Sequence, residues 1–496
     1  MSVSDSDIRT YGNWRKPSSP GIGKLGLGGS VVVMGGLVVI VMSMMISLTL
    51  AIFVLVVVLL CVAPLLIRDS HGRNGLQWLG SRTAWFRGLT LGQHIYRAGP
   101  IGRIPTGTCR LPGVLSALTV QDVTDAYGAQ FGLISNPATN QHSVVLTCSA
   151  DGASLVDPVQ VDTWVAYWGQ WLAGLAYEPS LTAVSVSIEA APDTGERLRR
   201  EVRGNTDPAA PELAQAVLNQ VMHDYPIGSA EITSRVALTY ARGDSGSSRR
   251  VAELAAEIGT RLPGLAGGLS MTGAGPAEPM TAAELAETVR VAYDPEVGLL
   301  ANHGDDMEGF AFAWEEAGPI AAQEAWDHYR HDGAFSITWA MTDAPRGEVF
   351  STVLSRLVSP HPDIVRKRVT LLYRPHSPSE SARLVERDRK DALYKAQQSR
   401  IAQARDSVEL RAADQSAREE ATGAGLIRFG LLLTATVLEE EHLPLASAAV
   451  DNLAATARIR LRRMYGAQSA AFAAALPLGV VLGDHLRVPQ SVRNVM

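Results

Sequence analysis

The sequence predicts a membrane-anchored α+β protein, with an N-terminal transmembrane helical hairpin followed by ferredoxin-like (split βαβ) cytoplasmic layers and a long polar helical arm. Three observations lead to this fold class. No charged residue occurs between Ser30 and Ile67, strand and helix patterns alternate after about residue 110, and residues 377–421 are rich in paired charges. Each feature predicts a different part of the architecture.

The charge-free run predicts two membrane spans. One span needs about 20 apolar residues, and this run is nearly twice as long. Two short helices, roughly 28–45 and 47–67, joined near Ser43–Ser47, resolve the mismatch. Gly35 and Gly36 would let the two helices approach closely. One long tilted helix is the alternative. Residues 28–67 are therefore expected to form the transmembrane hairpin.

Basic residues flank the apolar run on both sides. Arg9, Arg15, Lys16 and Lys24 precede it, and seven arginines follow it up to Arg110. Under the positive-inside rule both flanks are cytoplasmic. The chain is thus expected to be a multi-pass protein of the cell membrane with both termini in the cytoplasm. Residues 1–27 would form a cytoplasmic tail.

Residues 68–110 combine aromatic and basic side chains. Trp78, Trp85, Phe86 and Tyr96 lie among the arginines. Such a mixture suits a juxtamembrane segment at the lipid headgroups, and single-stranded nucleic acid is the alternative ligand. The expected non-protein partner is membrane lipid.

Composition narrows the remaining possibilities. The chain has 496 residues, a net charge of −6 and three cysteines. The length suggests two or three domains, and the negative charge gives no reason to expect direct sequence-specific binding of nucleic acid. Three scattered cysteines favour free thiols in a reducing compartment.

The rest of the chain predicts two α+β halves, residues 111–292 and 293–496. Asp157 and Pro158 open a helix over 158–175 with tryptophans on its apolar face. Alternating residues predict a strand at 184–188, and further strands are expected at 235–240, 336–341, 364–373 and 429–437. Helices are expected at 249–262, 347–357 and 444–463. Their alternation suggests sheets with helices on one face.

The helical arm is expected over residues 377–421. Ser377 and Glu380 form a capping box around Pro378, and the ordered pairs include Glu386 with Lys390. Apolar residues are sparse, so the arm cannot bury a broad face. A docking arm up to about 60 Å long and a plain solvated helix are both compatible with this pattern.

Few residues suggest chemistry. Gly23-Lys24 lacks the earlier glycine of a phosphate loop, and Gly243–Gly246 resembles a protease nucleophile loop only in its local letters. His328 and His331 are three apart, so on a helix they could share a metal with Asp327 or Asp332 nearby. The cluster Asn302–Asp306 is the one further source of ligands. No catalytic, cofactor-binding or metal residue is therefore assigned, and no cofactor is expected.

Several motifs resemble a family of actinobacterial integral membrane proteins associated with conjugation and type IV secretion. They are Tyr11–Arg15, Pro20–Gly23, Ala63–Asp69, Trp326–Gly333 with Ala344–Arg346, Leu461–Gly466 and Ala475–Gly479. The N-terminal hairpin is similar to the small two-span subunit of these systems. The remainder resembles the non-catalytic N-terminal half of the conjugation ATPase. In the motif Ala344–Arg346 the family is expected to have a tryptophan before Pro345, and this sequence has Ala344 there.

The resemblance implies a membrane-anchored, non-catalytic scaffold of a machine that transfers DNA or protein. Its partners would be a P-loop ATPase docked at the cytoplasmic face and other secretion-channel subunits, and self-association stays open. A type VII secretion membrane component is one alternative. A membrane-tethered enzyme using the His328/His331 cluster is the other.

Overall fold

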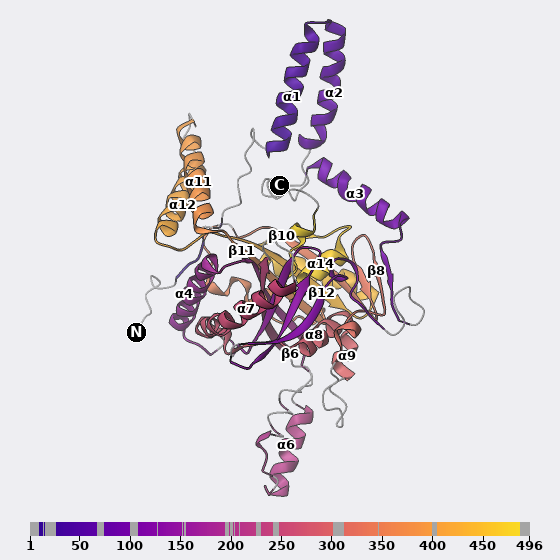
Figure 1. Ribbon diagram of the computed structural model, residues 1–496, viewed down its shortest axis with the longest axis vertical. Coiled ribbons are helices and arrows are strands. Elements are labelled where there is room, and N and C mark those ends of the chain that lie inside the picture. The colour runs from indigo at the N-terminus through magenta and orange to yellow at the C-terminus, as the bar shows by residue number, and fades with distance from the viewer. Residues whose placement is uncertain are drawn as a thin grey trace. The chain divides into compact units, whose positions relative to one another are not determined.

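The computed structural model describes residues 9–12, 14, 26–66, 74–99, 108–125, 127–150, 152, 155–193, 198, 202, 204–207, 209–224, 230–241, 248–300, 312–345, 347–398 and 404–486. The chain divides into two compact units (Figure 1). The helical unit comprises Arg15–His94 and Gly483–Met496, and the sheet unit comprises Met1–Trp14 and Ile95–Leu482.

Three helices make up the described core of the helical unit. They are α1 (Gly26–Met44), α2 (Leu48–Leu66) and α3 (Gly75–Thr90). The backbone N–H of Ser47 donates to Ser43 O at 3.1 Å and closes the turn between α1 and α2. A Cβ on Gly36 would lie 2.7 Å from Val58, so a glycine is needed where the two helices approach.

The predicted transmembrane hairpin is wrong. Among the residues that the structure describes, no helix combines the length and the apolar character needed to cross a membrane. The charge-free run forms two helices of 19 residues joined by a turn. The membrane-anchored fold class and the multi-pass location in the cell membrane are withdrawn with it, whereas the lipid partner stays a prediction.

The predicted juxtamembrane segment at 68–110 is not one element. Its first described part is α3, and its second part is the strand β1 (Ile95–Arg97), which pairs with β8 (Ala321–Glu324) in the sheet unit. Tyr96 donates a hydrogen bond from its hydroxyl to Arg110 O. The aromatic residues of this segment therefore serve two different units.

One antiparallel sheet organises the sheet unit. Within the described residues its strands follow the order β1-β8-β9-β10-β12-β11-β5-β6-β4-β3-β2, with β13 added beside β10 and β7 beside β4. The other strands are β2 (Thr119–Thr124), β3 (Gln130–Asn136), β4 (Gln141–Cys148), β5 (Leu181–Pro192), β6 (Ala230–Ala241), β7 (Ala277–Pro279), β9 (Tyr329–His331), β10 (Ala334–Asp343), β11 (Arg366–Pro375), β12 (Ile427–Val437) and β13 (Arg460–Arg463).

The sheet contains the same β-α-β-β-α-β-α connection twice. The first copy runs β4, α4 (Pro158–Gly174), β5, β6, α7 (Ser248–Leu269), β7 and α8 (Ala282–Tyr293). The second runs β10, α10 (Ser355–Val358), β11, β12, α13 (Leu443–Thr456), β13 and α14 (Gln468–Ala475). The strand orders, β7-β4-β6-β5 and β13-β10-β12-β11, are the same, and β5 pairs with β11 to join the copies. The two halves thus share one continuous sheet.

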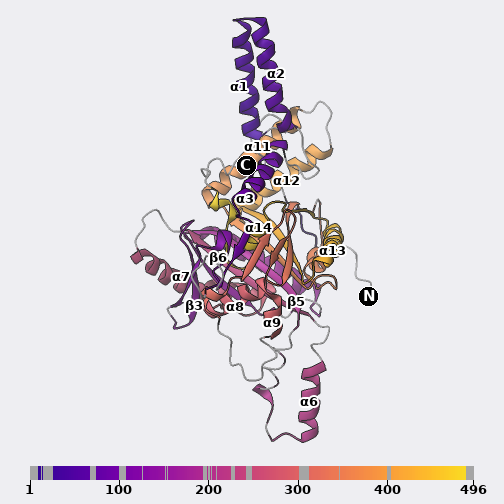
Figure 2. The same ribbon diagram turned by 90° about the vertical axis from the view of Figure 1, so that its right-hand side faces the viewer.

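Helices cover both faces of the sheet, not one face as expected (Figure 2). Alternate residues such as Val184, Leu238 and Val369 face α4, α7 and α13. On the other face, Val145 and Ala237 pack with α8 and α14 around Phe472. The sheet is consequently buried between two helical layers.

Each copy carries an insertion between its second and third strands. In the first copy the insertion includes α6 (Glu212–Asp224), and in the second it includes α11 (Pro378–Gln398) and α12 (Ala404–Ala421). Because β5 and β11 are antiparallel, the insertions leave from opposite ends of the sheet (Figure 1). The single long helical arm predicted at 377–421 is wrong in one respect: the segment contains two helices, α11 and α12, which form a hairpin.

Two other helix predictions need correction. The helix expected at 347–357 is reduced to a 3-10 turn at Ser351–Leu354 and α10. The helix expected at 444–463 ends with α13, and its last residues form β13. The helix at 158–175 and the strands around 184–188, 235–240, 336–341, 364–373 and 429–437 are confirmed, and α7 extends the helix expected at 249–262.

Candidate functional site: two histidines and the polar face of the sheet

His328 and His331 lie in a β-hairpin and not on a helix. β9 runs from Tyr329 to His331 and pairs with both β8 and β10. Tyr329 and His331 are buried while Arg330 between them is exposed, so side chains alternate across the strand. His328 contacts Phe335, and His331 lies among Tyr293, Tyr329 and Phe472. The strand separates the two imidazoles, and a shared metal is not possible.

His331 is completely enclosed. Its Nδ1 lies 2.5 Å from Tyr293 O, and its Nε2 lies 2.8 Å from Ser336 Oγ. Because a carbonyl only accepts, Nδ1 carries the proton and Nε2 accepts from the Ser336 hydroxyl. Burial lowers the pKa of His331 to about 4, against the backbone hydrogen bond, which favours protonation. His331 is therefore neutral near pH 7.

The Ser336–His331 pair has the hydrogen bonds of a nucleophile and its base. Both side chains, however, are 0% exposed. Ser336 Oγ also lies 2.7 Å from Thr436 Oγ1, which continues the chain of hydroxyls inward. No substrate can reach this hydroxyl without opening the core, so the pair joins β9, β10 and β12.

His328 belongs to a surface ion-pair group. Its Nδ1 lies 3.0 Å from Asp327 Oδ1, and Arg463 donates to Asp327 Oδ2 at 3.3 Å. Asp332 lies apart from this group: its Oδ1 accepts the N–H groups of Ile320 and Ala321, and its Oδ2 is 3.0 Å from Arg290. Of the four residues of the predicted cluster, only His328 and Asp327 contact each other, whereas Asp332 and His331 have separate partners.

Metal ligands are not gathered in the described part of the chain. Within it, no group of three His, Cys, Asp or Glu side chains could hold a metal ion. The segment Asn302–Asp306 and the loop Gly243–Gly246 lie outside the described residues, as does Gly23-Lys24. Cys109 and Cys148 are free thiols, and burial raises the pKa of Cys148 to about 11.

The sequence reading missed a row of buried hydroxyls on the face of the sheet that α8 and α14 cover. Four pairs link neighbouring strands, Ser143–Thr239, Ser187–Thr370, Thr338–Thr434 and Ser336–Thr436, at 2.7–3.1 Å. Cross-strand hydroxyl pairs of this kind stabilise sheets modestly. Here they lie beside apolar residues of the same face, such as Val145 and Ala237.

Backbone carbonyl groups at the end of α14 and in the segment after it accept hydrogen bonds from the hydroxyls of this face. Thr370 donates to Ala475 O at 2.7 Å, and Thr239 donates to Gly479 O at 2.8 Å. Gln468 Oε1 accepts the N–H of Thr338 at 2.8 Å. The sequence pattern that could have indicated these buried hydroxyls is the alternation of Ser and Thr with aliphatic residues, as in Ser185–Ile188. The same alternation is equally typical of a strand whose polar face is exposed to solvent.

A charged cluster lies on the same face. Glu189 of β5 is buried against Arg366 and Arg368 of β11, and Arg235 of β6 approaches it from the other side. None of these residues stands out in the sequence, because each is an ordinary polar position of an alternating strand. Only the pairing of β6, β5 and β11 brings them together.

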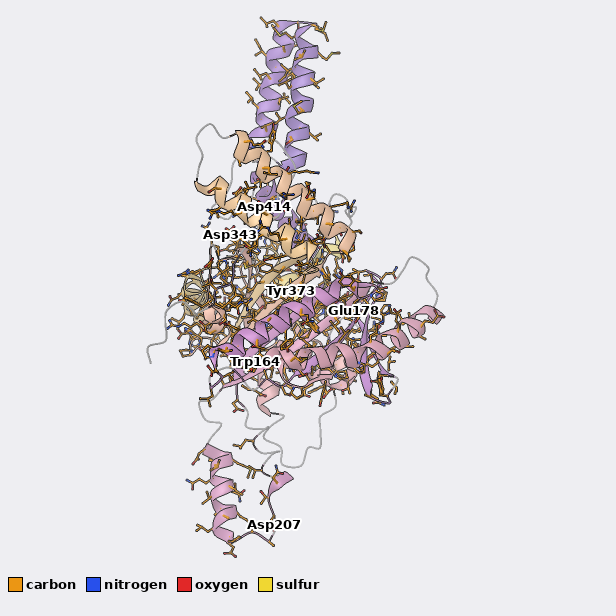
Figure 3. The ribbon with its side chains drawn as sticks, turned by 90° about the vertical axis from the view of Figure 1, so that its left-hand side faces the viewer. Trp164, Glu178, Asp207, Asp343, Tyr373 and Asp414 are labelled. Carbon is orange, nitrogen blue, oxygen red and sulfur yellow. The ribbon has the colours of Figure 1, made fainter. Side chains whose placement is uncertain are left out.

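The α11–α12 hairpin is the most polar described element. Its two helices pack on each other through Val385, Ala392 and Ala413, and Arg389 Nε donates to Asp414 Oδ1 across them at 2.9 Å. At its base, His376 N donates to Leu426 O at 3.0 Å and continues the β11–β12 pairing. The hairpin stands away from the sheet, as the position of Asp414 in Figure 3 shows.

Comparison with known proteins identifies one segment. Residues 18–77 match the model of a protein family described as a domain of unknown function (DUF8461). That segment contains α1 and α2 and ends at the beginning of α3. No curated protein matches the chain.

Proposed function

We propose that this protein is a non-catalytic scaffold that docks a partner protein through the α11–α12 hairpin. The observation that carries the proposal is the construction of this hairpin. It is joined at its base to the β11–β12 ladder, it packs on itself, and Arg389 forms ion pairs with Glu386 and Asp414 within it.

The charged residues of the α11–α12 hairpin are better suited to recognising a partner protein than to stabilising the fold. Arg389, Asp414, Glu386 and Lys390 pair with side-chain exposures between 37% and 72%. Exposed pairs of this kind contribute roughly 0–1 kcal/mol each, whereas charged surfaces steer association and select partners. A 44-residue excursion from a β-hairpin (Pro378–Ala421) is therefore hard to explain as a stabilising device.

The resemblance to conjugation proteins provides the partner class. We propose a P-loop ATPase of a transfer or secretion machine as the docked protein, with other subunits of the same machine as further neighbours. The enzyme alternative receives no support from His331, since its imidazole is enclosed and separated from His328.

Deletion of the hairpin tests this proposal. Pro375 and Ile427 are register partners, so residues 377–425 can be replaced by a short Asn-Gly turn that keeps the ladder intact. The matched control replaces residues 193–229, because Pro192 and Ala230 are likewise partners. Full-length and control chains, tagged and purified from the native host, should retain the same P-loop ATPase.

The hairpin deletion should lose that ATPase while keeping a cooperative unfolding transition. Two results would contradict the proposal: an ATPase that stays bound after the hairpin is removed, or the absence of any ATPase from the full-length purification.

A further inference from the structure

The charged cluster on β6, β5 and β11 has more positive than negative charge. Glu189 Oε1 accepts from Arg366 Nε and Arg368 Nη2, each at 3.0 Å, and Glu189 Oε2 accepts from Arg368 Nε at 3.4 Å. Arg235 Nη1 is 4.0 Å from Glu189 Oε2. Three guanidiniums thus surround one carboxylate, which leaves an excess of two positive charges.

The protonation states of Glu189 and the three arginines leave this excess of positive charge in place. Burial by itself would raise the pKa of Glu189, but Arg366, Arg368 and Arg235 hold it well below its usual range. The carboxylate is therefore charged at every ordinary pH, and arginine keeps its proton in proteins. Within 4 Å, the described residues offer Arg235, Arg366 and Arg368 no second carboxylate. The exposed Glu231 on the same strand as Arg235 acts on that guanidinium only from a greater distance. Partly buried charge without a counter-charge is costly.

The excess charge lies at the accessible rim of the cluster. The side chains of Glu189 and Arg368 are 4% and 5% exposed, whereas those of Arg235 and Arg366 are 17% and 18% exposed. Arg235 donates from Nη1 to Thr233, but its Nε is buried and lacks a hydrogen-bond partner in the described structure. The rim therefore presents two guanidiniums, and beneath it the buried Arg235 Nε is an N–H donor without a partner among the described residues.

We propose that Arg235 and Arg366 form a binding site for a phosphate group, with Arg368 and Glu189 as its fixed floor. A phosphate dianion matches the excess of two charges, and its oxygens accept the paired N–H groups of a guanidinium. Glu189 orients the arginines by accepting from two of them. The bound group is either free phosphate or the phosphate of a small monoester.

Thermal unfolding of the full chain in increasing inorganic phosphate tests the site, with sodium chloride holding ionic strength constant. Ligand that binds only the folded state raises the melting temperature in a saturable manner, and broadening of the ³¹P resonance reports binding directly. Arg235→Gln should weaken phosphate binding by about tenfold. Arg356→Gln, an exposed arginine on α10, is the matched control and should leave it unchanged.

Glu189→Gln separates a binding site from a purely structural ion network. The amide keeps the shape of the side chain but removes its charge, so phosphate binding should tighten several-fold even though the free protein loses stability. Repeating the titration with glycerol phosphate identifies the source: equal affinity indicates a monoester, and weaker binding indicates the free ion.

The proposal fails if phosphate has no saturable effect beyond that of chloride. It also fails if Arg235→Gln and Arg356→Gln weaken phosphate binding equally, or if Glu189→Gln weakens binding together with stability.

Discussion

At the scale of single residues, His331 shows how burial fixes the state of a side chain. Its imidazole stays neutral because a charged ring would lose its hydration among Tyr293, Tyr329 and Phe472. The spacing of His328 and His331 suggested a metal pair, yet that inference assumed a helix. On a strand, the same spacing places the two rings on opposite sides.

His331 should make the protein acid-sensitive. Its pKa in the folded state is about 4 against a reference of 6.5, so the unfolded state binds more protons between these values and stability falls as pH decreases from 6.5 to 4. The expected loss from this group is roughly 3 kcal/mol. Denaturant unfolding at several pH values should show a smaller acid loss for His331→Gln. The control His442→Gln, on an exposed histidine, should keep the wild-type loss, and equal losses in both variants would contradict the assignment.

Lys367 makes a contribution of the same sign at alkaline pH, because its pKa is also lower in the folded state. Burial lowers its pKa to about 8 from 10.5, and its Nζ donates to Ser359 O. Between pH 8 and 10 the unfolded chain binds the extra proton, so stability should rise by about 1–2 kcal/mol. Lys367→Met should abolish this rise, whereas Lys390→Met on the exposed arm should preserve it. A rise that survives in Lys367→Met would assign the effect to another group.

At the scale of elements, the segment after α14 depends on one glycine. Gly479 has φ +68°, and a Cβ there would lie 2.4 Å from Thr239 Oγ1 and 2.5 Å from Ser143 Oγ. Gly479→Ala should therefore cost about 2–4 kcal/mol in denaturant unfolding. Gly128 has φ +90° but open space around it, so Gly128→Ala should cost only about 1 kcal/mol. Similar losses in the two variants would show that the polar face does not need this close approach.

The sequence predicted those elements whose apolar pattern is strong and local. Alternation identified β5, the recurring strand–helix pattern identified β6, β10, β11 and β12, and the spacing of its tryptophans identified α4. β13 was missed because Arg460–Arg463 continues a helical composition, and α8 and α14 hide the polar face through contacts that no local pattern encodes. The helices α1 and α2 lie close to the predicted spans at 28–45 and 47–67, but among the described residues no helix is long and apolar enough to cross a membrane.

At the scale of the whole molecule, the repeated connection makes two halves into one sheet. β5 and β11 pair over seven residues from Lys367↔Ala190 to Tyr373↔Val184. Leu371 contacts the apolar clusters of both copies. Neither copy can open fully without exposing the edge and apolar face of the other.

The two copies should therefore unfold together. Cys148 is buried in the first copy, so its reaction with a thiol reagent reports opening there once Cys61 and Cys109 are replaced by serine. Hydrogen exchange of β12 reports the second copy. Both signals should change at the same denaturant concentration. Reaction of Cys148 while β12 remains protected would show two independent domains.

Docking through α11–α12 can be measured by hydrogen exchange of the full chain with and without the purified partner ATPase. Exchange should slow in residues 378–398 and 404–421 on complex formation, with no change in α6, which is the corresponding insertion at the opposite end of the sheet. Protection confined to other elements, or an arm that exchanges equally fast in both states, would contradict it.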